Sequence, residues 1–130
     1  MADQAHLAML KQGADAWNAW RLAHAGTPAN LANASLRGLD LARANLAGAD
    51  CRAADLRGTV LSGATLTDAN LAGANFFKSV LDDADLGGAN LVGARFLNCA
   101  QLETTRNWQS AFRDPDLACG APVPRIADPP

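Results

Sequence analysis

Residues 29–98 read ANLAN ASLRG LDLAR ANLAG ADCRA ADLRG TVLSG ATLTD ANLAG ANFFK SVLDD ADLGG ANLVG ARFLN, which is 14 consecutive blocks of five residues. The first position of a block is Ala in 11 of the 14, and the third position is Leu in 11 of the 14. The second position is mostly Asn or Asp, and the fifth is often Gly. A repeat this regular predicts that every block adopts the same local structure and stacks on its neighbours.

A period of five residues matches neither the 3.6-residue period of an α-helix nor the two-residue period of a strand. A short extended piece followed by a tight turn fits it, because the first and third positions then point inward and the second points outward. Gly, Asn and Asp at the fifth position supply the turn at low steric cost. We therefore expect an all-β solenoid.

Three irregular blocks indicate how many blocks make one coil. Leu39, Thr59 and Ser79, the first positions that are not Ala, follow one another at every fourth block, which predicts four blocks per coil. The third-position side chains are then expected to stack as four columns that form the core: Leu31, Cys51, Leu71 and Leu91; Leu36, Leu56, Phe76 and Phe96; Leu41, Leu61 and Leu81; Leu46, Leu66 and Leu86.

The pattern A-(D/N)-L-x-x, repeated over 14 blocks, resembles the pentapeptide repeat proteins. The resemblance covers residues 29–98 and implies a right-handed quadrilateral β-helix, with one block per side and four blocks per coil. On this basis we expect a β-helix of about 3.5–4 coils over residues 29–104. An N-terminal capping helix (1–28) is expected before it, and a short helical or irregular cap with a Pro-rich tail (105–130) after it.

Both ends of such a coil expose unpaired backbone edges that need covering. Residues 4–25 carry apolar side chains at spacings of three and four, which predicts one amphipathic helix. Trp17 and Trp20 of this segment are expected to pack on the first coil, with a partner-binding aromatic patch as the alternative. Trp108 and Phe112, four residues apart, are expected to plug the last coil.

The sequence contains no nucleophile–base pair, metal-ligand spacing or phosphate-binding motif, so we expect a non-catalytic protein without metal or cofactor. Cys51 occupies a core position and is expected to be a buried, inert thiol. Cys99 and Cys119 would meet only if the C-terminal tail folded back, and three cysteines without close spacing favour a reducing compartment. His6 and His24 are expected to be ordinary helix residues.

Charge and hydropathy narrow the choice of partner. The net charge of −2 argues against nucleic acid, and no apolar run reaches the length of a membrane span. Residues 1–12 lack the pattern of a secretory signal, so we expect a cytoplasmic protein.

The expected function is a protein-interaction or structural module, whose partner is an unidentified protein or a second copy of the chain. The candidate surface consists of outward apolar residues, some of which occupy matching positions four blocks apart: Phe77, Leu97, Val92, Val60 and Val80. Isolated surface hydrophobics, or contact with the C-terminal tail, are the other interpretation.

Family resemblance also raises an alternative function, because some pentapeptide repeat proteins protect DNA gyrase from quinolones as DNA-mimicking rods coated with acidic residues. Residues 29–98 contain seven Asp and six Lys or Arg, a net charge of 6 − 7 = −1. This is far from the charge density of a duplex, which carries one negative charge per ~1.7 Å of axis. The sequence therefore disfavours a DNA mimic.

Overall fold

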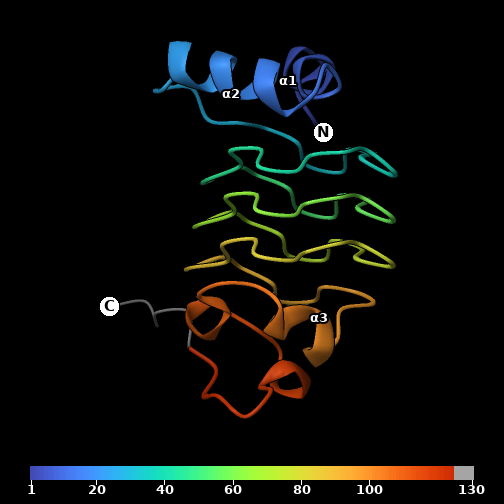
Figure 1. Ribbon diagram of the computed structural model, residues 1–130, viewed down its shortest axis with the longest axis vertical. Helices are drawn as coiled ribbons and strands as arrows, with labels where there is room; N and C mark the ends of the chain where they lie inside the picture. Colours follow the sequence, from blue (N-terminus) through green and yellow to red (C-terminus); the bar gives the residue numbers. More distant parts are fainter. Residues whose placement is uncertain (125–130) are drawn as a thin grey trace.

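The computed structural model describes residues 1–124, and Figure 1 shows them as a stack of coils with helices at both ends. The helical elements in chain order are α1 (Gln4–Leu10), α2 (Ala14–Ala23), α3 (Cys99–Glu103) and the 3-10 turns η1 (Trp108–Ser110) and η2 (Pro115–Leu117). None of the helices in this part of the chain is long and apolar enough to cross a membrane.

Each block contacts the fourth block after it through a parallel bridge between second positions. Ten such bridges occur in residues 1–124, from Asn30↔Asp50 to Asn75↔Arg95. Around the first of them, the N–H of Leu31 donates to the carbonyl of Asp50 at 2.7 Å, and similar bonds repeat along the stack. The four-block spacing that the sequence predicted is therefore present, and each coil contains four blocks.

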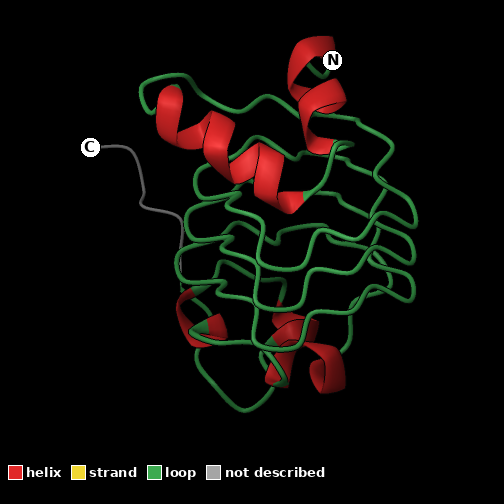
Figure 2. Cartoon of the chain, turned by 45° about the horizontal axis from the view of Figure 1, so that its top comes forward, coloured by secondary structure: helices red, strands yellow, loops and turns green. Residues whose placement is uncertain are grey.

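The extended pieces are shorter than the strands that an all-β solenoid implies. Figure 2 shows the coils as loops and turns, and no segment of residues 1–124 forms a continuous strand. The reason lies in the turn that ends each block: the N–H of Ala34, the first residue of the next block, donates back to the carbonyl of Leu31 at 3.0 Å. Every fifth position from Asn33 to Gly93 has φ between 56° and 74°. Each block therefore keeps one extended residue that is bridged to an adjacent coil.

The third-position side chains fill the interior of the coils. Thirteen of the 14 expected core residues are buried, and they are Leu31, Leu36, Leu41, Leu46, Cys51, Leu56, Leu61, Leu66, Leu71, Phe76, Leu81, Leu86 and Leu91. Two first positions that are not Ala are also satisfied, because the hydroxyl of Thr59 donates to the carbonyl of Leu36 at 2.8 Å and that of Ser79 to Leu56 at 2.6 Å. Buried polar groups with hydrogen-bond partners cost little stability.

Phe96 is the exception, and its expected place in the core is wrong. Its side chain is 63% exposed and its φ is 57°. In the earlier blocks the residue with a left-handed backbone (positive φ) is the fifth. In this block it is the third, so the chain leaves the coil two residues early. The ring consequently points outward, and α3 follows with Leu102 fully buried against the core.

The N-terminal cap consists of two helices rather than the single helix expected over residues 4–25. Gly13 separates α1 from α2 with φ of 108°, a conformation that residues with a Cβ rarely adopt. The side chain of Trp17 is fully buried, and its indole N–H donates to the carbonyl of Asn45 at 2.7 Å. Trp20 is half-buried and stacks on Trp17 with ring centroids 5.1 Å apart. Both rings therefore belong to the cap.

Polar side chains of the cap satisfy the open edge of the first coil. The amide of Asn18 accepts from the N–H of Asn45 at 2.7 Å, and Arg21 donates to the carbonyl of Ala47 at 2.6 Å. The buried His6 accepts from the N–H of a first-coil residue, Asn30, at 3.1 Å. The cap thus replaces the hydrogen bonds that a preceding coil would have made.

Coil contacts continue beyond residue 104, the expected end of the repeat. Parallel bridges join Asp85 to Arg106 and Asn90 to Phe112. Phe112 is half-buried at this bridged position, so it does not plug the interior as expected. Arg113 is the side chain that is buried next to it, with its guanidinium carbon 5.0 Å from the centroid of the buried Trp108 ring.

A disulfide joins Cys99 to Cys119, so the C-terminal segment does fold back. The expectation of separate, reduced cysteines is corrected by this bond. The two residues are 20 apart, the length of one coil, which brings α3 beside the segment after η2. The end of the Pro-rich tail, with Pro129 and Pro130, lies outside the described residues.

Candidate interaction surface

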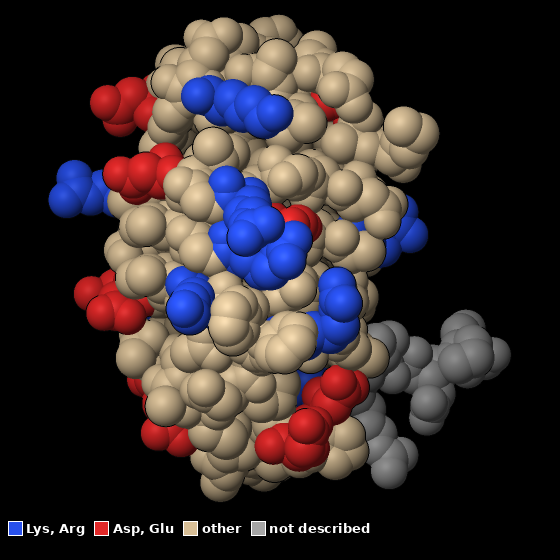
Figure 3. Space-filling view, turned by 90° about the vertical axis from the view of Figure 1, so that its right-hand side faces the viewer, with Lys and Arg blue, Asp and Glu red and all other residues tan. Residues whose placement is uncertain are grey.

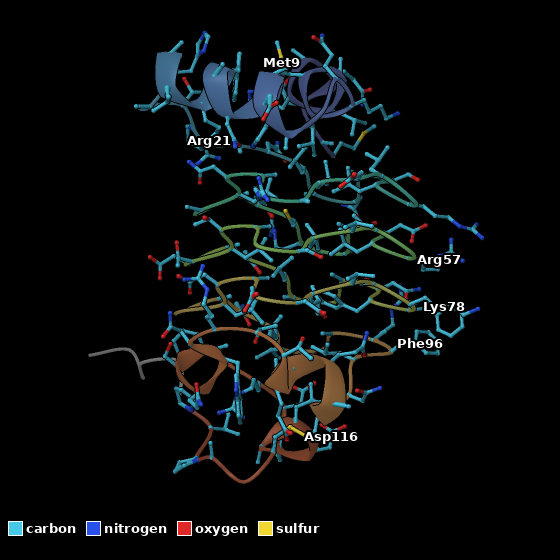
Figure 4. The ribbon with its side chains drawn as sticks, viewed as in Figure 1. Met9, Arg21, Arg57, Lys78, Phe96 and Asp116 are labelled. Atoms are coloured by element: carbon cyan, nitrogen blue, oxygen red, sulfur yellow. A yellow bond between two sulfur atoms is a disulfide. The ribbon has the colours of Figure 1, made fainter. Side chains whose placement is uncertain are left out.

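One side of the stack collects exposed cationic and aromatic side chains. It is built from the blocks that begin at residues 34, 54, 74 and 94. We call its row of outward side chains the basic–aromatic strip, defined by Arg37, Arg57, Phe77, Lys78 and Phe96, of which Arg57 is half-buried and the others are exposed. Figure 4 shows the labelled side chains of Arg57, Lys78 and Phe96 along the same edge of three successive coils. The strip follows from the repeat, because identical block positions lie above one another.

Two phenylalanine rings form the apolar part of the strip. Phe77 is 46% exposed, and its ring meets that of Phe96 edge to face with centroids 5.4 Å apart. The ammonium nitrogen of Lys78 lies 5.4 Å from the centroid of Phe77. Edge-to-face pairing and a cation over the ring fix the rings in place. A rigid apolar surface is thereby kept in contact with water.

Two shallow hollows meet along the strip. One, of about 340 Å³, is lined by Arg37, Gly38, Arg57, Gly58, Phe77 and Lys78. The other, of about 460 Å³, is lined by Phe77, Lys78, Phe96, Leu97, Asn98 and Gln101. Because Phe77 and Lys78 line both, the hollows share a boundary and follow the strip from the first coil to α3.

The strip is positively charged. Its cations are Arg37, Arg57 and Lys78, and Arg95 lies exposed on the same side of the stack. The nearest counter-charge is Asp55, whose two carboxylate oxygens accept from Arg57 at 2.8 and 2.7 Å. Figure 3 shows a group of Lys and Arg side chains in the middle of this face.

Ion pairs within blocks fix some of these charges. The hydrogen bonds from Arg57 lower the pKa of Asp55 to about 2, so this carboxylate stays ionised at neutral pH. The same pairing occurs on the neighbouring side, where Arg52 lowers the pKa of Asp50. Arg37 differs from both arginines because its block carries Ser35 in place of the aspartate.

The structure brings together only some of the candidate surface residues. Phe77 and the half-buried Leu97 line the same hollow. Val60 and Val80 are bridged to each other on the next side of the stack, and Val92 lies exposed on a third side. Sequence reasoning missed Phe96, which it had placed in the core. The matching block positions of Arg37 and Arg57, four blocks apart, were the available signal for the cations.

The remaining thiol, metal-ligand and hollow sites of the described chain do not form a second candidate functional site of this kind. Burial raises the pKa of the Cys51 thiol to about 12, which leaves it protonated and unreactive. Cys99, Glu103 and Cys119 come within metal-ligand distance of one another, but both sulfurs are joined in the disulfide. A further hollow of about 530 Å³ lies between the start of α2 and the first coil, lined by Gln12, Gly13, Ala14, Asp15, Asp40, Ala42 and Arg43.

We expect that Phe96→Asn changes the free energy of unfolding by less than about 1 kcal/mol. Asn adopts the left-handed backbone more readily than Phe, and this gain offsets the lost edge-to-face contact with Phe77. Urea denaturation measures the effect, with Phe76→Asn as the buried control, expected to lose at least about 3 kcal/mol. A loss above about 2 kcal/mol for Phe96→Asn would show that the ring is kept for folding.

Comparisons with known proteins agree with the repeat. The sequence profile described as pentapeptide repeats (8 copies) matches residues 29–63, 44–82 and 60–98, more than half of the chain. A pentapeptide repeat protein from the thylakoid lumen of Arabidopsis thaliana is 26% identical with a TM-score of 0.55, over 68% of this chain and 59% of that one. No curated protein matches the chain.

Two cyanobacterial structures are also similar in sequence. HetL, a pentapeptide repeat protein involved in heterocyst differentiation regulation in Nostoc sp. strain PCC 7120, is 35% identical with a TM-score of 0.30, over 69% of this chain and 38% of HetL. The pentapeptide repeat protein Rfr23 of Cyanothece 51142 is 28% identical with a TM-score of 0.26, over 69% and 63%. This chain therefore covers less than two thirds of each of the three structures.

Proposed function

This chain belongs to the pentapeptide repeat family, and from that membership and its surface we propose that it is a non-catalytic scaffold that binds a partner protein through the basic–aromatic strip. The fold we propose for its coils is the right-handed quadrilateral β-helix that its relatives imply. Both the family match and the four-block spacing of the bridges support this fold.

The single observation that carries the proposal is the exposed aromatic pair. Phe77 and Phe96 stay in water beside a hollow, although the interior holds the large side chains of the neighbouring blocks. Aromatic residues and Arg are enriched at protein interfaces, whereas Asp, Glu and Lys are depleted there, so the two rings and the two arginines carry this argument and Lys78 does not. The inter-coil hydrogen bonds hold the strip rigid, so binding costs little ordering of the surface.

The double variant Phe77→Glu/Leu97→Glu is expected to abolish binding, and circular dichroism verifies that it is folded, because the half-buried Leu97 also packs against the core. The experiment selects a random peptide library displayed on phage against the purified protein. The control is Val92→Glu, which adds an acid at another exposed apolar position. We expect clones that bind the wild type and the control but do not bind the double variant, because two carboxylates make the hollow polar and charged.

Light scattering on the same proteins tests whether the partner is instead a second copy of the chain. A wild-type mass that doubles with concentration, and does not in the double variant, would identify a second copy of the chain as the partner. A constant monomer mass, together with no clones that depend on Phe77 and Leu97, would overturn the proposal.

Neither a DNA mimic nor a cytoplasmic location is part of the proposal. A DNA mimic needs a continuous acidic coat, and the face in Figure 3 carries a group of cations instead. The disulfide between Cys99 and Cys119 is a kind of bond that persists in oxidising compartments, and the cytoplasmic location expected from the sequence stays a prediction.

A further inference from the structure

We infer that the occupant of the basic–aromatic strip is an acidic segment of another protein, in which Asp or Glu residues flank a large apolar side chain. The inference rests on the proposed function and names the chemistry of the partner. It follows from three properties of the strip, which are its unpaired cations, its exposed rings and the acidic residues at its margins.

Two of the cations make no direct ion pair within the described residues, although Arg37 is close enough to Asp55 to contribute to the lowered pKa of that carboxyl. The ion pairs of residues 1–124 use Arg52 and Arg57 but neither Arg37 nor Lys78. Successive coils are spaced by the inter-strand distance of ~4.8 Å, so Arg37 and Lys78, two coils apart, are roughly 10 Å from each other along the stack. Carboxylates two or four residues apart share one face of an extended segment, which rises ~3.3 Å per residue, and their separations of about 7 and 13 Å bracket that distance.

The apolar part of the strip lies within the same surface. Phe77 lines both hollows, and Lys78 lies over its ring, so a bound apolar side chain would pack on Phe77 and Phe96 while carboxylates approach the ammonium group. A segment with acids alone would leave the rings exposed. A segment with apolar residues alone would bury the cations without counter-charges, which is unfavourable.

A second copy of the chain fits this surface poorly. A two-fold interface is self-complementary, so it would bring the strip of one copy against the strip of the other. The cations Arg37, Lys78 and Arg95 of one copy would then lie near the cations of the other, and like charges brought together across an interface oppose binding strongly.

Nucleic acid fits poorly as well. Figure 3 shows Asp and Glu side chains at the lower end of this face and along one of its edges, where an extended polyanion would pass. The basic area is therefore short, which suits a peptide segment. The net charge of the chain, −2, gives no long-range attraction for a duplex.

The test uses the clones selected above and a charge-reversal variant. We expect the clones that depend on Phe77 to carry net negative charge and at least one Leu, Ile, Met or aromatic residue. One such sequence, made as a fluorescent peptide, is then titrated by anisotropy. Arg37→Glu/Lys78→Glu is expected to weaken binding by at least about tenfold, since two attractive contacts are replaced by repulsive ones.

The control is Arg43→Glu/Arg52→Glu, which changes the net charge equally. Arg43 is an exposed fifth-position residue with φ of 64°, close to the 59° of Lys78, and Arg52 occupies a fourth position like Arg37. We expect this control to change affinity by less than about threefold, by long-range charge alone. Circular dichroism and urea denaturation of both variants verify that they are folded.

The outcomes separate this inference from the proposed function. Clones that depend on Phe77 but are neutral or basic would overturn the acidic partner and leave the strip as a protein-binding surface. Equal weakening by both charge variants would also overturn it, because the charge effect would not be local to the strip. A lack of clones that depend on Phe77, with monomer mass throughout, would overturn both.

Discussion

Replacing Arg113 with Met is expected to lower the free energy of unfolding by about 3 kcal/mol and to detach the C-terminal cap. The buried guanidinium donates to five carbonyl oxygens at 2.7–3.2 Å, which are those of Gln109, Ala111, Leu117, Ala118 and Pro122. Met matches the aliphatic part of the arginine side chain but has no guanidinium and no donor, so the five carbonyls lose their partner at once. Urea denaturation followed by tryptophan fluorescence measures the loss, because Trp108 packs against Arg113.

Arg106→Met is the matched control for this prediction. Arg106 is exposed at the end of the same coil, and its side chain makes one hydrogen bond, to the carbonyl of Asp83 at 3.1 Å. The expected loss for the control is below about 1 kcal/mol. Equal losses for the two variants would mean that Arg113 does not hold the cap together.

Arg113 also shows why the ends of the stack were not predictable from the sequence. Inside the repeat, each block specifies its own turn, and the Oδ1 atoms of residues such as Asn30 and Asp40 accept from the N–H two positions later. Because every block therefore has the same structure, the three first positions that are not Ala were enough to predict four blocks per coil. The five carbonyls around Arg113 come from a segment without a repeat, so no local sequence pattern predicts that they accept hydrogen bonds from Arg113.

The residues of the candidate surface could be predicted where their block follows the five-residue repeat, and not where the repeat breaks down. Phe77 was placed outward correctly because its block is regular. Phe96 was misplaced because the left-handed turn moved from the fifth position of its block to the third, and the block reads ARFLN with no glycine to mark the change. The disulfide had a usable signal, since Cys99 and Cys119 are one coil length apart, but the repeat had already lost phase there.

The largest loss of stability from truncating one side chain to Ala is expected at the centre of the stack, for Leu66→Ala. Leu66 is fully buried in the column of Leu46 and Leu86, with one neighbour on each side. Removing its side chain leaves a cavity that cannot collapse, because the inter-coil hydrogen bonds, such as that from the N–H of Leu46 to the carbonyl of Thr65 at 2.8 Å, hold the coils apart. Buried Leu→Ala changes cost about 2–5 kcal/mol, and the rigid coil places this site at about 4.

Leu22→Ala is the control, because Leu22 of α2 is 82% exposed and its truncation is expected to cost less than about 0.5 kcal/mol. Guanidinium or urea denaturation followed by circular dichroism compares the two variants. We also expect the slope of the transition to be unchanged for Leu66→Ala, since coils that share hydrogen bonds unfold together. A loss below about 1 kcal/mol for Leu66→Ala would contradict a close-packed interior, and a shallower slope would instead show that the two halves of the stack unfold separately.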